Sequence, residues 1–263
     1  MTNKKLYSGP RRDVVKIFWT GGWDSTFQLL RLLLVHKVPV ETFYLIDEGR
    51  NSTAAELKAM DQIRKYLFKE YTHTDELFKP VQYFDVSDIP QYESITEAYN
   101  NISENKHIGS QYMWLAGFCE YKSISNIQLC LVKHPVNYSN HFSLIGSVEK
   151  FKEGSMLNYK IAEKYKGSDE YILFKYFSIP TINLSKIEMK KIAFENGWGN
   201  IMKQTWFCHH PRKMKPCGIC NPCLIAIDDN VSFRIPLKSR AISLFYKKSP
   251  QRIKKKIKKM YYQ

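Results

Sequence analysis

The clearest pattern in the chain is a short apolar run over residues 14–19, followed by a second apolar run over residues 27–35. The first run is continuous and brief, which favours a strand buried on both faces of a parallel sheet. The second run has the length and leucine content of a helix. Residues 20–26 between them are mostly small or polar and include two adjacent glycines. The pattern therefore predicts a strand, a glycine turn and a helix in succession.

The same alternation continues along the chain. The last predicted helix starts at a capping box made by Ser185 and Glu188 and stops at Gly197. Strands that alternate with helices predict an α/β fold whose parallel sheet is covered on both faces, with ligands at the carboxyl ends of the strands. The further strands are expected at residues 41–47, 81–86 and 127–132, and the helices at residues 52–71, 110–121 and 185–196.

Other segments carry weaker patterns. Residues 89–109 are polar without a clear period and are expected to form an irregular loop or lid, and residues 134–170 are expected to line or cap a site. Residues 172–177 fit either a strand or a helix, and residues 180–184 are expected to be extended. The predicted division of the chain is a main α/β domain over 1–200, a small cysteine-rich subdomain over 201–236 and a basic tail over 237–263.

The glycine turn, Thr20-Gly21-Gly22-Trp23-Asp24-Ser25-Thr26, has the features of an anion site. A helix N-terminus offers free backbone N–H groups, and the helix dipole favours negative charge there. The hydroxyls of Thr20, Ser25 and Thr26 add donors, and the carboxylate of Asp24 is suited to hold Mg²⁺ against phosphates. The stretch has neither the lysine of a Walker loop nor the spacing of a dinucleotide fingerprint.

Composition places the chain among packed globular proteins. Hydrophobic residues make up 44% of it and aromatic residues 14%, which disfavours wholesale disorder. The first residues are polar and basic, unlike a secretory leader, and no apolar run reaches the roughly 18 residues of a membrane span. A cytoplasmic protein is expected.

The formal charge of +15 is concentrated near the C-terminus. Ten lysines and arginines and no acidic residue lie from Lys238 onward, which leaves +5 for the residues before it. The segment Arg252–Tyr262 has isoleucines four residues apart and is able to form a basic amphipathic helix. Such a segment suits an anionic membrane surface or an acidic or nucleic-acid partner, and a solvated tail without a specific partner is equally compatible.

A cysteine cluster lies near the C-terminus. Four thiolates at this spacing suit a closed, tetrahedral structural zinc site, which leaves no position for catalysis. An iron–sulfur cluster and unligated thiols are the alternatives, and His209 and His210 are spare ligands if one cysteine does not bind. The four clustered cysteines, within a span of sixteen residues, are Cys208, Cys217, Cys220 and Cys223.

Several stretches together carry a resemblance to a known family. Thr20–Ser25 resembles the loop S-G-G-x-D-S of the PP-loop ATP pyrophosphatases. Glu48-Gly49-Arg50 followed by Ala55-Glu56-Leu57 is similar to a second family motif, G-Q-R/H…E-L, and Ser185–Met189 resembles S-K-x-E-I. Thr205–Cys208 and Pro216–Cys223 resemble T-W-S-C and P-C-G-x-C-D-x-C. The combination is similar to the 7-cyano-7-deazaguanine synthases of queuosine biosynthesis over most of residues 14–227.

The resemblance implies a five-stranded parallel sheet of the adenine nucleotide α-hydrolase type. It implies that ATP is split to AMP and pyrophosphate, that a carboxylate is adenylated, and that ammonia converts it to an amide and then, after a second activation, to a nitrile. It also implies bound Mg²⁺ and Zn²⁺, and a homodimer is among the expected assemblies. Asp24 and Ser25 would be catalytic. The implied ATP- and pyrophosphate-binding residues are Thr20, Gly21, Gly22, Trp23, Asp24, Ser25, Thr26, Gly49 and Arg50.

The expected substrate pocket departs from the family pattern. Ser110-Gln111 stands where the family has an R-N pair, and Asn137-Tyr138-Ser139 retains only part of the segment that faces the deazaguanine base. These five residues are the substrate-pocket candidates. A paralogue that acts on a different carboxylate is therefore an open alternative.

Two further functions also stay open. One is a PP-loop thiolase or amidotransferase that acts on tRNA or a sugar, for which Cys119 and Cys130 are the candidate sulfur nucleophiles. Both cysteines lie in apolar surroundings in the sequence, which is more typical of core residues. The other is a nucleotide-binding protein without catalytic activity.

Overall fold

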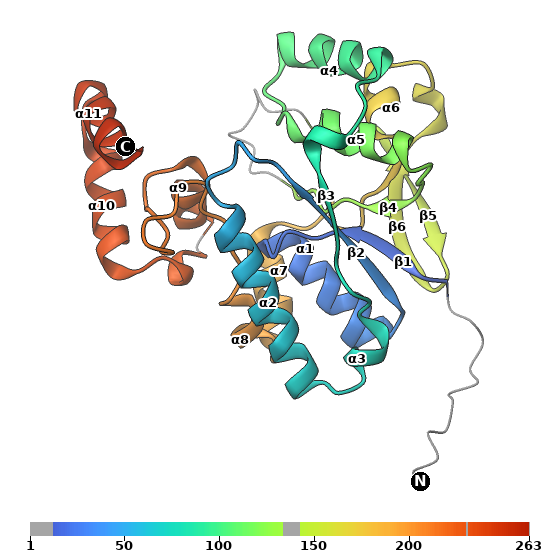
Figure 1. The fold of residues 1–263 in the computed structure, drawn as a ribbon, viewed down its shortest axis with the longest axis horizontal. Helices are drawn as coiled ribbons and strands as arrows, with labels where there is room; N and C mark the ends of the chain where they lie inside the picture. Colours follow the sequence, from blue (N-terminus) through green and yellow to red (C-terminus); the bar gives the residue numbers. More distant parts are fainter. Residues whose placement is uncertain (1–12, 134–142, 230, 263) are drawn as a thin grey trace.

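The computed structural model describes residues 13–133, 143–229 and 231–262. Its centre is a five-stranded sheet with the strand order β3-β2-β1-β4-β7, in which every neighbouring pair is parallel (Figure 1). The predicted α/β class with a five-stranded parallel sheet is confirmed. The strands are β1 (Val15–Phe18), β2 (Val40–Ile46), β3 (Gln82–Asp85), β4 (Ile127–Gln128) and β7 (Phe177–Ser178).

Alternating side chains of the central strand enter two different cores. Ile17 and Trp19 pack with the core under α1 and α2, whereas the ring of Phe18 lies 5.9 Å from Phe118 and 6.2 Å from Phe177 on the other side. Burial on both faces explains why the strand appears in the sequence as a continuous apolar run.

Helices cover both faces of the sheet (Figure 1). On the first face lie α1 (Trp23–Leu30) with its π-helical continuation η1 (Arg31–His36), α2 (Thr53–Glu70), α7 (Lys186–Glu195) and α8 (Gly199–Met202), and on the second lie α4 (Glu93–Asn105), α5 (Gln111–Tyr121) and α6 (Asp169–Phe174). Short turns connect them: α3 (Thr74–Leu77), η2 (Val86–Asp88), η3 (Glu163–Tyr165) and η4 (Ser232–Arg234). The predicted capping box at the start of α7 is confirmed.

Several sequence predictions were wrong in detail. The loop expected over 89–109 contains the helix α4, whose buried Ile95, Ala98 and Ile102 form a stripe at helical spacing that the surrounding polar residues obscure. The first helix begins at Trp23 rather than at residue 27, so the polar end of the glycine turn is its first turn.

Other differences lie in the second half of the chain. The strand expected over 127–132 is only two residues long, and residues 172–177 divide between the end of α6 and the start of β7. Of residues 180–184, which were expected to be extended, residues 180–183 form a turn. An antiparallel hairpin, β5 (Val148–Glu153) and β6 (Met156–Ile161), lies within 134–170, where little pattern was found.

A buried polar network fixes this hairpin to the sheet. The Gln28 amide donates to Oε1 of Gln128 over 2.9 Å, and Gln128 donates in turn to Oε2 of Glu153 over 3.3 Å. Asn158 donates to the same Glu153 oxygen over 2.9 Å. Buried polar groups need such partners, so the network holds α1, β4 and the hairpin in one arrangement.

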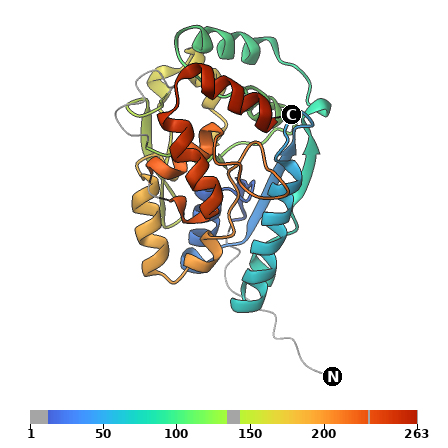
Figure 2. The ribbon, with the colours of Figure 1, turned by 90° about the vertical axis from the view of Figure 1, so that its left-hand side faces the viewer.

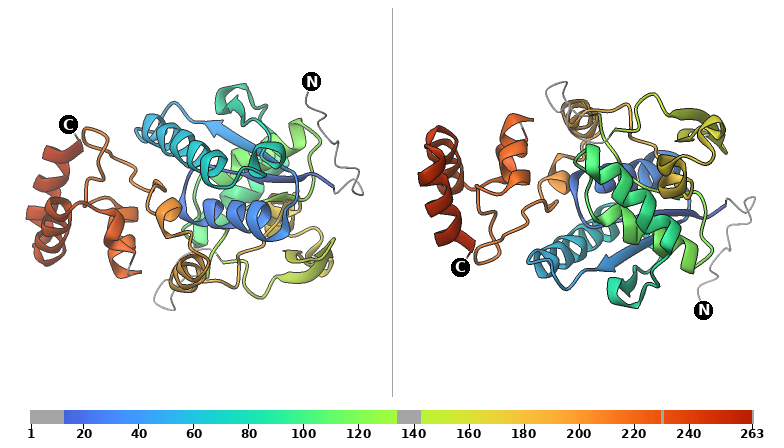
Figure 3. Two further views of the ribbon diagram at one scale, coloured as in Figure 1. Left: turned by 90° about the horizontal axis from the view of Figure 1, so that it is seen from below. Right: turned by 90° about the horizontal axis from the view of Figure 1, so that it is seen from above.

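The C-terminal part of the chain forms a lobe at one end of the molecule (Figures 1 and 3). It contains α9 (Asn221–Asp228), α10 (Leu237–Lys248) and α11 (Gln251–Tyr262). The sequence prediction of a helix over the basic tail is confirmed by α11. Among the described residues, no helix combines the length and the apolar character needed to cross a bilayer.

Candidate functional site

The glycine turn follows the end of β1 and includes the first turn of α1. The chain runs from β1 outward through β2 to β3, and later fills the other side of β1 with β4 and β7 (Figure 1). The connections therefore leave β1 and β4 in opposite directions. In open parallel sheets, ligands bind at the carboxyl ends of the strands where this reversal occurs, and the glycine turn sits at that position.

Different steric constraints favour glycine at position 21 and at position 22. Gly21 has φ of 66°, and a Cβ there would lie 3.0 Å from Met60 Cγ and 3.4 Å from the Glu56 carbonyl oxygen. A side chain at Gly21 would thus meet both backbone strain and the first turns of α2. Gly22 has ordinary extended geometry, but a Cβ there would lie 3.1 Å from Thr20 Oγ1.

The N-terminus of α1 has no side-chain cap, so its first backbone N–H groups are available to a ligand. Gly22 is the N-cap residue and provides no side-chain cap, so the N–H groups of the first turn have no such partner. Asp24 and Ser25 in this turn, and Thr20 before it, are partly exposed. The arrangement offers backbone donors and hydroxyls together with one carboxylate.

Two of the implied ATP residues face the protein interior. Trp23 is buried, and its ring lies 5.9 Å from that of Phe233. Thr26 is also buried, and its Oγ1 accepts a hydrogen bond of 3.0 Å from the indole of Trp19. Both side chains support the turn from the interior, whereas Thr20, Asp24 and Ser25 are partly exposed, with Oδ1 of Asp24 buried.

Gly49 and Arg50 lie at the next strand end, after β2. The Arg50 guanidinium is 3.0 Å from Oε1 of Glu56, which also accepts a 2.7 Å bond from the hydroxyl of Ser52. The second oxygen of Glu56 accepts a 2.9 Å bond from Tyr44. Burial, followed by the charge and hydrogen bond of Glu56, raises the pKa of Tyr44 well above its usual value. The phenol therefore stays protonated and donates to the carboxylate.

A cavity of about 340 Å³ brings together residues that were predicted from distant segments. Gly49 and Arg50, predicted to bind ATP, share its lining with Ser110 and Gln111, predicted to contact the second substrate. Residues 20–26 do not line this cavity. Of the other substrate-pocket candidates, Asn137, Tyr138 and Ser139 lie outside the described residues. The remaining lining residues are Asp47, Asn51, Ser52, Gly109, Trp114, His209 and His210.

The charge of Asp24 acts on groups from three other parts of the chain. It contributes to the raised pKa of Tyr112 on α5 and of Cys130 after β4, although burial is the larger cause for both. It also opposes the effect of burial on Arg234, which lowers the pKa of that guanidinium to about 10. The charge of Asp24 is thus close enough to affect all three of these groups.

Neither isolated cysteine is prepared to act as a nucleophile. Cys119 is buried in the core under α5, and burial raises the pKa of its thiol well above the ordinary value. Burial and then the charge of Asp24 raise the pKa of Cys130 in the same direction. A reactive cysteine needs a lowered pKa, because the thiolate is the attacking species. Both thiols stay protonated at neutral pH.

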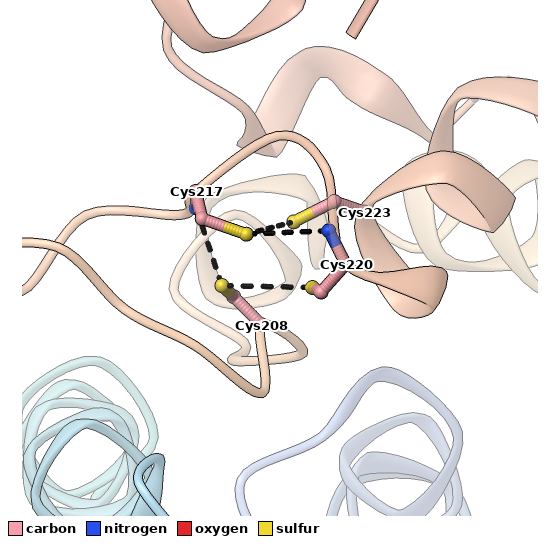
Figure 4. A group of neighbouring side chains, drawn as sticks. All are labelled: Cys208, Cys217, Cys220 and Cys223. Carbon is pink, nitrogen blue, oxygen red and sulfur yellow. Dashed lines mark hydrogen bonds between the residues drawn. The ribbon is translucent and has the colours of Figure 1, made fainter. Parts of the chain in front are cut away.

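The four clustered cysteines converge, as Figure 4 shows. All four are buried, and their sulfur atoms lie within 4.8 Å of one another. Cys208 and Cys220 are 3.8 Å apart at sulfur, and Cys217 and Cys223 are 4.0 Å apart. Ligands at about 2.3 Å from a tetrahedral zinc ion are separated by about 3.8 Å. The cluster therefore has the dimensions of a Cys₄ zinc site, and neither His209 nor His210 is needed to complete it.

Local backbone geometry supports this cluster. The N–H groups of Ile219 and Cys220 point to Cys217 Sγ at 3.4 and 3.3 Å, and the Cys217 N–H points to Cys208 Sγ at 3.2 Å. The neighbouring thiols, Cys208 first, and the Ile219 N–H lower the pKa of Cys217. Cys223 lies in the first turn of α9, which begins next to Cys220. Such N–H donors stabilise thiolates, the form that binds a metal.

The cysteine module is joined directly to the glycine turn. The Trp206 N–H, two residues before Cys208, donates to the Gly21 carbonyl over 2.8 Å. Arg234 donates to Thr205 Oγ1 over 3.0 Å, and its guanidinium lies 4.7 Å from the Trp23 ring centre. A metal that holds Cys208 in place therefore also holds the support of the turn.

Sequence reasoning missed two contributors to this region. Arg234 gave no signal, because it stands outside every motif and becomes informative only when the fold brings it against Trp23. Trp114 was assigned only to a predicted helix, although its position three residues after Gln111 places it on the same side of α5.

In comparisons with known proteins, no family model matches the chain, and neither the curated proteins nor the solved structures yield a match.

Proposed function

We propose that this chain is an ATP-dependent ligase of the PP-loop type, similar to the 7-cyano-7-deazaguanine synthases, that adenylates a carboxylate and releases pyrophosphate. The proposal rests chiefly on one observation. An uncapped helix N-terminus follows a two-glycine turn at the point of the parallel sheet where strand connections reverse. That combination favours binding of a phosphate chain.

The proposed chemistry explains why such a turn is needed. A carboxylate is a poor electrophile, so one of its oxygens attacks the α-phosphorus of ATP and the bond to the β-phosphate breaks. Pyrophosphate leaves, and the acyl-adenylate formed is reactive. Ammonia then attacks the carbonyl carbon, AMP leaves, and the amide results with loss of one proton. A second round of activation, on the amide oxygen, allows loss of AMP to give the nitrile.

The residues of the turn would stabilise the departing pyrophosphate. The N–H groups at the start of α1, which have no side-chain cap, and the partly exposed hydroxyls of Thr20 and Ser25 would donate to the developing negative charge. Asp24 would hold Mg²⁺, which neutralises charge on the phosphates when bound. Arg50 and the α5 start, Ser110-Gln111, line the neighbouring cavity, where the carboxylate substrate would be oriented.

The four cysteines would hold zinc in a structural role. A Cys₄ site is closed, so it offers no open position to a substrate. Its proposed function is to fix the segment before Cys208, whose Trp206 N–H supports Gly21. The raised pKa values of Cys119 and Cys130 disfavour the alternative of a thiolase that uses either thiol as nucleophile.

The test is a reaction with ATP, Mg²⁺, ammonium and 7-carboxy-7-deazaguanine, in which AMP, pyrophosphate and the amide or nitrile are quantified. We expect all three products, and at least a hundredfold lower rate in Asp24→Ala. The surface variant Asp61→Ala is the matched control, because Asp61 pairs with Lys65 on the exposed side of α2. If 7-carboxy-7-deazaguanine does not react but another carboxylate causes ATP to release pyrophosphate, the proposal is restricted to a paralogue.

A further inference from the structure

The outer side of α10 carries an unusual set of apolar residues. Leu237 is 78% exposed, Leu244 56% and Phe245 62%. With the exposed Ala241 they occupy positions i, i+4, i+7 and i+8, which place them along one side of the helix. Large exposed apolar side chains gathered in this way mark an interaction surface more often than isolated ones do.

The inner side of α10 is firmly attached to the cysteine module. Ser243 is buried and donates to the carbonyls of Gly218 and Ser239. Ser239 donates to the Pro216 carbonyl over 2.8 Å, and Tyr246 is buried. The exposed apolar side is therefore presented by a helix that is fixed in orientation.

The next helix, α11, contributes mainly positive charge. Ile257 and Tyr261 pack inward, and the Tyr261 ring receives Arg212 at 4.5 Å. Tyr262 stacks on His210 at 3.9 Å. Arg252 and four lysines make up five of the nine exposed residues of α11, and Met260 is 64% exposed.

Both helices lie in front of the rest of the molecule when it is viewed from the end of the C-terminal lobe (Figure 2). Their outward sides therefore face the same way. Seven exposed cations lie on this pair, and none of the seven forms an ion pair within the part of the chain that the structure describes. They are Lys238, Lys248, Arg252, Lys255, Lys256, Lys258 and Lys259.

The combination of charge and apolar area distinguishes between partners. A second copy of the same surface would place cations against cations, because this segment contains no acidic residue. A nucleic acid would satisfy the cations but would give no apolar environment to Leu237, Leu244 and Met260. An anionic bilayer does both, because its headgroups attract the lysines and its acyl boundary accepts the apolar side chains.

We propose that α10 and α11 form a docking surface for anionic lipid bilayers, with Leu237, Leu244, Phe245 and Met260 entering the headgroup region. The surface is separate from the glycine turn and does not depend on the proposed ligase activity. Docking leaves the molecule peripheral to the bilayer, with the opposite end of its long axis directed away from the membrane (Figure 1).

The experiment is cosedimentation of the full chain with vesicles of phosphatidylcholine alone and of phosphatidylcholine mixed with phosphatidylserine. We expect binding to the mixed vesicles only, and weaker binding as salt is added. Changing Lys255, Lys256, Lys258 and Lys259 together to Gln removes charges worth about fivefold in affinity each, so binding should fall by on the order of several hundredfold. Changing Leu237, Leu244 and Phe245 together to Ser should lower affinity by about tenfold or more.

Matched controls carry the same substitutions at exposed sites on other faces. Lys69, Lys79, Lys106 and Lys191 changed to Gln control for net charge, and Val35, Leu157 and Ile187 changed to Ser control for hydrophobicity. Both control variants should bind the mixed vesicles as the unchanged chain does. Circular dichroism and zinc content verify that each variant is folded.

Four results would overturn the proposal. One is equal binding to both vesicle types, or none to either. The second is unchanged binding in both α10–α11 variants. The third is that the chain does not bind the mixed vesicles but binds single-stranded RNA or duplex DNA tightly, and that the lysine variant abolishes this binding. That result would assign the surface to nucleic acid. Concentration-dependent dimerisation that the α10 variant abolishes, with no vesicle binding, would assign it to a second copy.

Discussion

Single residues at the glycine turn are constrained for identifiable reasons. Gly21 needs its left-handed backbone and its missing side chain, because Met60 and the Glu56 carbonyl approach it closely. Thr20, Asp24 and Ser25 are partly exposed, whereas Trp23 and Thr26 are buried. The sequence motif therefore contains two kinds of residue: one suited to contact a ligand, the other to hold the turn.

Replacing Gly21 by alanine tests this separation. We expect Gly21→Ala to weaken binding of a non-hydrolysable ATP analogue by at least about tenfold, because positive φ alone costs about 1–2 kcal/mol and the new Cβ displaces Met60. Isothermal titration measures the effect. Gly197→Ala is the matched control, since Gly197 has φ of 75° with nothing within 4 Å of the added Cβ. Equal analogue affinity in the two variants would contradict the assigned role of the turn.

Helices and strands could be predicted from the sequence where one pattern of apolar residues dominated the segment. The buried strand at 15–18 and the helix α2 follow from continuous or strongly periodic apolar residues. The helix α4 was missed because its short apolar stripe is surrounded by polar residues, and the hairpin was missed because its strands are only partly buried. Strand order and the hairpin's buried polar network depend on contacts between distant segments, which a single sequence does not contain.

The contact between α10 and the cysteine module is a further element-level feature. A Cβ on Gly218 would lie 2.3 Å from the Ser239 carbonyl oxygen of α10, and Gly218 has φ of 87°. No side chain fits there unless the helix moves.

We expect Gly218→Ala to lower the free energy of unfolding by about 3–5 kcal/mol, as backbone strain and the displacement of α10 add together. Urea unfolding measures this change. Gly154→Ala carries the same kind of strain at φ of 60° without a neighbour, so it should cost only about 1–2 kcal/mol. If the two variants are equally stable, the packing of α10 on the module is not as described.

At the scale of the whole molecule, the cysteine module is the link between the site and the C-terminal lobe. It supports Gly21 through Trp206 on one side and carries α10 through Pro216 and Gly218 on the other. The four clustered cysteines were predictable as candidate metal ligands, because their spacing alone identifies them. The junction of the module with the turn through Arg234 and Thr205 was not predictable, since Arg234 matches no sequence pattern and the motif that contains Thr205 does not indicate this contact.

Removing the metal should therefore affect the distant turn. Treatment with a strong chelator is expected to lower the Tm and to weaken binding of the ATP analogue by about tenfold, the effect of losing one ordering hydrogen bond worth about 1.4 kcal/mol. Zinc, added back, should restore both, and added magnesium should not. Unchanged analogue affinity in a chain shown to be free of metal would contradict the coupling.

The most direct test of the central claim is to identify which phosphate bond of ATP is broken. The chain, ATP, Mg²⁺, ammonium and a set of carboxylates that includes 7-carboxy-7-deazaguanine are incubated together and followed by phosphorus NMR. We predict AMP and pyrophosphate in equal amounts, dependent on the carboxylate and lost in Asp24→Ala. Formation of ADP and phosphate, or ATP that stays intact with every carboxylate, would contradict the assignment of the glycine turn to carboxylate adenylation.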